Sequence, residues 1–107
     1  MADPQFEKKL QEFIALVDAT IAAADALRGE DPVRVAHADS LLSALYMMRG
    51  HARDYLAEGI LPDEQWPPSV WKMETWSPKW KTFFDGCRAV PAFIAAYTKS
   101  QGKKGLN

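Results

Sequence analysis

The sequence predicts an all-α domain: a long antiparallel helical hairpin, an aromatic-rich connecting segment and a third helix kinked at a proline, together a bundle of three to four helices. Apolar residues recur at steps of three and four along most of the chain, and no stretch shows the alternation of a half-buried strand. The pairs Asp3-Pro4, Asp31-Pro32 and Ser77-Pro78 are typical of helix starts. In each pair the side-chain oxygen can accept a hydrogen bond from a first-turn amide, and proline fits a position where an N–H is not needed.

Length and composition limit the classes of protein. With 107 residues, 48% apolar and 25% charged, the chain resembles an average globular domain. A net charge of −1 gives no reason to expect a nucleic-acid or membrane partner. No apolar run reaches the length of a membrane span, and the first residues do not resemble a secretory signal. We expect one cytoplasmic domain over residues 1–100, followed by a frayed tail over 101–107.

The first predicted helix covers residues 4–28 and ends at Gly29, which suits a left-handed cap. Its apolar stripe consists of Phe6, Leu10, Phe13, Val17, Ile21, Ala24 and Leu27. The second helix covers 32–57 and ends near Gly59, because Pro62 prevents its continuation. The turn between them has only three residues, so the two helices must pack as an antiparallel hairpin.

Gly50 lies within the second predicted helix and costs about 1 kcal/mol relative to alanine there. It either permits a close backbone contact or is simply tolerated.

The third predicted helix begins at Pro78, after a segment whose consecutive prolines Pro67 and Pro68 exclude a regular helix. Its apolar stripe consists of Trp80, Phe83, Phe84, Cys87, Val90, Ile94 and Tyr97. Pro91 interrupts the pattern and predicts a kink, or a break into two short helices.

Four tryptophans fall within fifteen residues: Trp66, Trp71, Trp76 and Trp80. Large rings can close the open side of a two-helix hairpin, which is one interpretation. The other is an aromatic recess or patch for a partner or an apolar ligand, with Tyr46 as a neighbour.

Arg49 falls inside the apolar arc of the second helix. A guanidinium cannot lose its proton there, so it either reaches water, pairs with Asp18, Asp25 or Asp39, or binds an anion together with Arg53. His51 and Asp54 have a spacing that could supply two metal ligands, but no third is evident, and we expect no metal and no cofactor.

A second stripe on the first helix holds only small residues, Ala15, Ala19, Ala22 and Ala26. The high helix propensity of alanine is one explanation of this stripe. The other is contact with another helix, because a helix with one buried face normally carries charges on the opposite side. That helix is either the third helix of this chain or the same stripe of a second copy, in a homodimer.

The sequence offers no catalytic constellation, since Cys87 lies in an apolar stripe with no base nearby. We therefore expect a small non-enzymatic protein-interaction module, an accessory or regulatory subunit that binds a protein partner or itself. The alternative is a small-ligand-binding bundle with a pocket lined by Trp and Tyr. The candidate binding residues are Trp66, Trp71, Trp76, Trp80, Arg49, Arg53, Tyr46 and His51.

Overall fold

The computed structural model describes residues 4–60 and 78–105, with side chains up to residue 100. This part of the chain contains helices and turns and no strand. The elements are α1 (Pro4–Asp25), α2 (Pro32–His37), α3 (Asp39–Gly50), α4 (Ala52–Glu58), the 3₁₀ turn η2 (Pro78–Trp80) and α6 (Lys81–Gly105). The predicted all-α helical bundle is confirmed.

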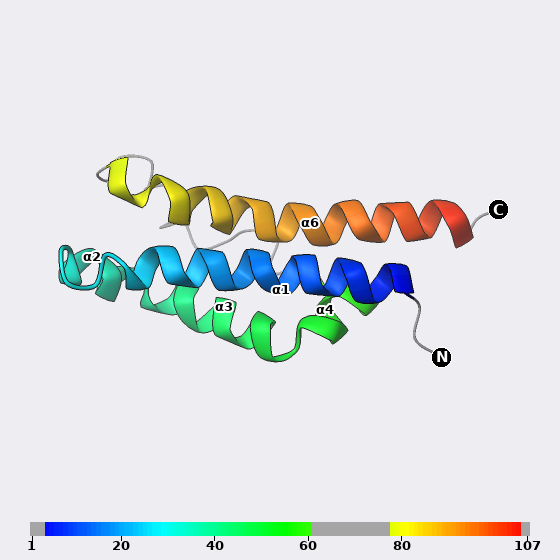
Figure 1. Ribbon diagram of the computed structural model, residues 1–107, viewed down its shortest axis with the longest axis horizontal. Coiled ribbons are helices and arrows are strands. Elements are labelled where there is room, and N and C mark those ends of the chain that lie inside the picture. Colours follow the sequence, from blue (N-terminus) through cyan, green and yellow to red (C-terminus); the bar gives the residue numbers. More distant parts are fainter. Residues whose placement is uncertain (1–3, 61–77, 106–107) are drawn as a thin grey trace.

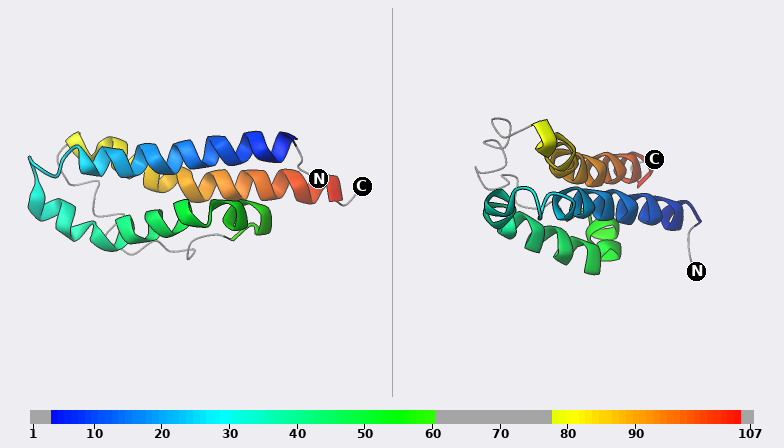
Figure 2. Two further views of the ribbon diagram at one scale, coloured as in Figure 1. Left: turned by 60° about the horizontal axis from the view of Figure 1, so that its bottom comes forward. Right: turned by 60° about the vertical axis from the view of Figure 1, so that its left-hand side comes forward.

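Helix α1 lies between the other helices. Figure 1 shows α6 along one side of α1 and α3 and α4 along the other, with α2 beyond the end of α1. The chain runs in one direction along α1 and returns along α3 and α4, as predicted for an antiparallel hairpin; α6 runs the same way as α3 and α4. Further views show that α4 also reaches α6 (Figure 2). The arrangement therefore gives α1 two packed flanks and one outer face.

The prolines mark helix starts as predicted. Pro4 begins α1, Pro32 begins α2 and Pro78 opens the turn that leads into α6. Asp31 caps the start of α2: one of its carboxylate oxygens accepts a hydrogen bond from the Arg34 amide at 3.4 Å. At the other end of this segment Gly59 adopts a left-handed conformation (φ 65°) and ends α4 where the sequence predicts.

The second predicted helix is divided into three, a correction to the continuous helix expected over 32–57. The first division falls at Ala38 and the second at His51, where φ is −119° and ψ is 30°. Gly50 stands directly before the second division, and its low helix propensity explains why the helix yields there. An added Cβ on Gly50 would meet nothing within 4 Å, so this glycine does not serve a close contact.

Helix α6 runs without interruption through Pro91, so the predicted break there is wrong. Proline removes one amide donor from a helix, but its neighbours Val90 and Ile94 are both fully buried. Packing of this apolar face holds the helix together across the missing bond. The helix continues to Gly105, beyond the boundary at residue 100 that the sequence predicts.

One core joins the helices. Its fully buried large side chains are Phe13, Val17, Leu41, Leu45, Met48, Leu56, Trp80, Phe83, Cys87, Val90 and Ile94. The predicted stripes supply most of them, which is why the helices pack in the predicted arrangement.

Helices α1 and α6 pack tightly at Thr20 and Gly86. Thr20 is buried, and its hydroxyl donates a hydrogen bond to the Leu16 carbonyl at 2.8 Å. An added Cβ on Gly86 would lie 2.8 Å from Thr20 Cγ2 and 2.9 Å from Thr20 Cβ. The Thr20 side chain therefore occupies the space that a side chain at position 86 would need.

We expect Gly86→Ala to lower the free energy of unfolding by about 1–3 kcal/mol, the usual cost of overpacking, although alanine is the better helix former. Urea denaturation measures this difference. Gly50→Ala is the matched control, and we expect it to be neutral or stabilising by up to ~1 kcal/mol. Thr20→Ala should recover part of the loss in the double variant; an undiminished loss would contradict the contact as its cause.

Candidate functional site

Trp80 lies in the core at the start of α6 and is 1% exposed. Its indole N–H donates a hydrogen bond to Asp31 Oδ2 at 3.0 Å, and its ring meets Phe83 edge-on with centroids 5.6 Å apart. The neighbouring Lys79 forms an ion pair with Glu30 at 2.9 Å. Trp80 thus fastens the start of α6 to the turn between α1 and α2 and presents almost no surface to a partner. Trp66, Trp71 and Trp76 lie outside the described residues.

Asp31 serves three donors at once. Besides the indole of Trp80, it accepts hydrogen bonds from the backbone amide and the guanidinium of Arg34. The hydrogen bond from Trp80, together with those from Arg34, lowers the pKa of Asp31 below its usual value. The carboxylate is therefore favoured over the acid in the folded chain.

The lowered pKa of Asp31 predicts a pH-dependent contribution to stability. Because this pKa is lower in the folded chain than in the unfolded chain, the contribution is present above about pH 4 and is lost as the pH falls further. Asp31→Asn keeps one oxygen acceptor, replaces the other oxygen with an NH2 donor and removes the charge, so we expect it to be less stable than wild type at pH 7.

Urea denaturation at a series of pH values checks this prediction. The difference in free energy of unfolding between wild type and Asp31→Asn should narrow below about pH 4. Trp80→Phe removes the indole donor, so in that background the difference in free energy of unfolding between Asp31 and Asp31→Asn should be smaller at pH 7. A difference that does not change with pH would contradict this account.

Arg49 and Arg53 both bind carboxylates of α1. Arg49 Nε donates to Asp18 Oδ1 at 2.9 Å, one of the pairings that the sequence leaves open. Arg53 binds both oxygens of Glu7, with NH1–Oε1 2.9 Å and NH2–Oε2 3.1 Å. Its guanidinium also lies over the Phe6 ring, 5.5 Å from the centroid. The hydrogen bond and ion pair with Glu7 raise the pKa of Arg53 above its ordinary value.

These two arginines join α3 and α4 to α1. Both pairs are about half exposed, so each contributes little to stability. Both guanidinium groups hold carboxylates of α1 in this structure. An anion site formed by Arg49 with Arg53 stays a prediction.

A double-mutant cycle with Arg53→Gln and Glu7→Gln measures the coupling energy of the ion pair that joins α4 to α1. We expect a coupling energy of about 0.2–1 kcal/mol in urea unfolding, as for exposed ion pairs. The cycle of Arg49→Gln and Asp18→Asn serves as comparison and should give a smaller coupling, since only one contact joins those side chains. A larger coupling at Arg49 would contradict the importance of the two-point contact.

Tyr46 and His51 lie on the exposed side of α3 and its junction with α4. Tyr46 is 53% exposed and the adjacent Met47 57% exposed, and Met47 Sδ accepts a hydrogen bond from the Tyr55 hydroxyl at 3.7 Å. Among the residues that the structure describes, no three His, Cys, Asp or Glu side chains lie close enough to hold a metal ion. Cys87 is fully buried, and burial raises the pKa of its thiol to about 12, so it is protonated at neutral pH.

The small residues of α1 form an open surface, which we call the alanine face: Ala15, Ala19, Ala22 and Ala26. All four are exposed with α6 in place, whereas Phe13, Val17 and Ala24 of the same helix are fully buried. Contacts of α1 with α6 are made by other residues, among them Phe6, Phe13 and Thr20. The sequence suggests two partners for this stripe, the third helix and a second copy of the chain. The third helix leaves the stripe uncovered.

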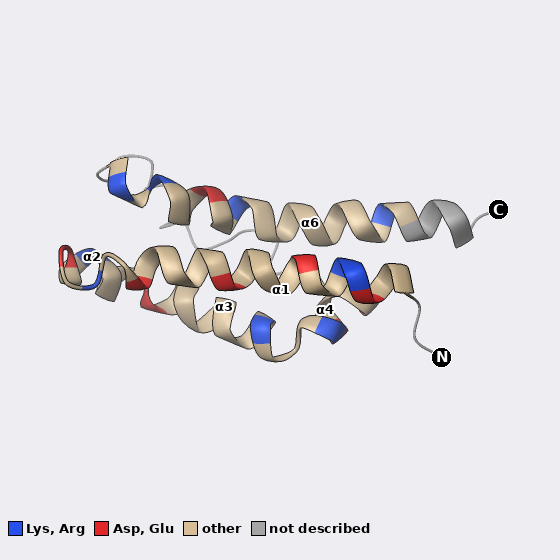
Figure 3. Ribbon diagram, in the orientation of Figure 1, with Lys and Arg blue, Asp and Glu red and all other residues tan. Residues whose placement is uncertain are grey.

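Helix α6 also has an uncharged stretch. Residues 89–98 carry no charge, and Figure 3 shows an uncharged span in the later part of α6. Ala92 and Ala96 within it are exposed. Ala96 lines a hollow that Glu12, one turn before Ala15, also lines.

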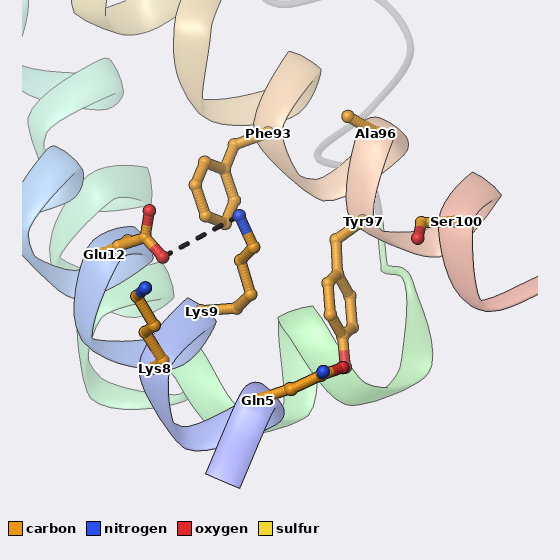
Figure 4. A pocket seen from close by; sticks show the side chains of 8 residues that line it. All are labelled: Gln5, Lys8, Lys9, Glu12, Phe93, Ala96, Tyr97 and Ser100. Atoms are coloured by element: carbon orange, nitrogen blue, oxygen red, sulfur yellow. Dashed lines mark ion pairs between the residues drawn. The ribbon is translucent and has the colours of Figure 1, made fainter.

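That hollow, of about 500 Å³, lies between the start of α1 and the later half of α6 (Figure 4). Its lining consists of Gln5, Lys8, Lys9, Glu12, Phe93, Ala96, Tyr97 and Ser100. The sequence does not predict this hollow, because Tyr97 continues an apolar stripe and no pattern within either helix shows that Lys8 and Phe93 share a site. The spacing of Phe93 and Tyr97 (i, i+4) is the only local signal.

Comparison with family models, with curated proteins and with solved structures gives no match for this chain. Across residues 4–60 and 78–105, every helix is too short or too polar to cross a membrane.

Proposed function

We propose that this chain is a small non-enzymatic interaction module that associates with a second copy of itself through the alanine face. The observation that supports the proposal is the exposure of Ala15, Ala19, Ala22 and Ala26 on a helix whose opposite side is fully packed. A solvated helix face normally carries charged residues, and this one carries none over three turns.

Small side chains allow two helices to approach closely, so that backbone and methyl groups pack over a long contact. An identical face on each copy makes the contact isologous, the commonest form of symmetric dimer. The contact needs only the alanine face, and the four alanine side chains bring no charge into it. A cytoplasmic location remains a prediction from the sequence alone.

The test is the mass of the chain in solution. Light scattering during size-exclusion chromatography should give twice the chain mass of 12.0 kDa at high concentration. Ala19→Arg and Ala22→Arg should each convert the protein to monomer, because a charge would be buried in the contact. The matched control is Ala57→Arg, at an exposed alanine of α4 outside the face, which should leave the mass unchanged. A wild-type protein that stays monomeric at all concentrations would overturn the proposal.

A further inference from the structure

We propose that the hollow between α1 and α6 binds a small amphipathic anion, an aromatic ring that carries one carboxylate or sulfonate group. The site does not rest on the proposed self-association, since all of its lining residues come from one copy.

The floor of the hollow is apolar and held in place from behind. The Phe93 ring packs on Phe13 with centroids 5.7 Å apart, and the Tyr97 ring packs on Phe6 with centroids 6.0 Å apart. Phe13 is fully buried, so at least one of the two supporting rings is fixed in the core. Phe93 and Tyr97 are themselves half-buried, and Figure 4 shows both side chains projecting from α6 toward α1. An aromatic ring stacked on such a floor gains contact without displacing a core residue.

The rim carries excess positive charge. The Lys9 ammonium lies 5.9 Å from the centroid of the Phe93 ring and 3.7 Å from Glu12 Oε2, which places its charge above the floor. Glu12 is the only acid of the lining and is occupied by this pair. Lys8 makes no ion pair within the described part of the chain. Two lysines against one acid leave a charge of +1, which favours an anion over a neutral or cationic molecule.

The dimensions agree with a small ring compound. A volume of about 500 Å³ lies within the usual range of ligand pockets, and the hollow is open on one side. A ring over Phe93 and Tyr97 directs an anionic substituent toward Lys8 and Lys9. The Ser100 hydroxyl, at the edge of the floor, supplies a further hydrogen-bond donor.

The test uses 2-naphthalenesulfonate as the anionic probe and 2-naphthalenemethanol as its neutral counterpart, each titrated into the isotopically labelled full chain. We expect amide NMR shifts to concentrate at Lys8, Lys9, Ala96 and Ser100, with the sulfonate bound more tightly than the alcohol. Lys8→Gln should weaken binding of the sulfonate several-fold and leave binding of the alcohol unchanged, because only the sulfonate has a charge to pair.

Two neighbouring alanines of α6 supply a matched pair. Ala96 lines the hollow and Ala95 does not, and both are exposed, so neither substitution disturbs the core. Ala96→Glu should weaken sulfonate binding by about tenfold through like-charge repulsion, whereas Ala95→Glu should change it less than about twofold. Equal loss in both variants, equal affinity for sulfonate and alcohol, or shifts centred on other residues would each overturn the proposal.

Discussion

The close crossing of α1 and α6 at Thr20 and Gly86 is the constraint on which the remaining contacts of α6 depend. No Cβ fits at position 86, because the Thr20 side chain lies against the backbone of Gly86, and a shift of α6 along α1 would bring a larger side chain against Thr20. Two other contacts fix the same register. Trp80 donates to Asp31 before the crossing, and Gly59 at the end of α4 has room only for hydrogen beside Thr98 after it.

This register decides what the later half of α6 can do. With the crossing fixed, Phe93 falls beside Phe13 and Tyr97 beside Phe6, near the start of α1. The lysines of the first α1 turns then stand over the rings of α6, although nearly ninety residues separate Lys8 from Tyr97 in the sequence. The hollow thus forms between two helices whose relative position is fixed by contacts outside the hollow.

Charge is distributed unequally around α1. On the flank that faces α3 and α4, Glu7 and Asp18 bind arginines. On the outer face, Ala15, Ala19, Ala22 and Ala26 carry no charge and remain open. Asp18, one turn from Ala15 and Ala22, stands at the edge of this face and binds Arg49. Helix α1 therefore packs within its own chain on one side and offers small side chains on the other.

Local patterns were sufficient for much of the fold. Aspartate or serine before proline identifies the helix starts, and apolar spacing identifies the core stripes, because both act over a few residues. The same local reasoning failed where packing opposed it: Pro91 predicts an interruption that burial of Val90 and Ile94 prevents, and no local signal at Ala38 predicts a division. The sequence narrowed the partner of Arg49 to three aspartates but could not choose Asp18, since the choice depends on how α1 and α3 are aligned. It determined by itself the all-α class, where helices begin after proline signals and which faces are apolar. Only the tertiary structure decided that Trp80 is a core anchor, that the alanine face stays open and that a hollow exists beside Lys8, because these depend on the register between segments distant in sequence.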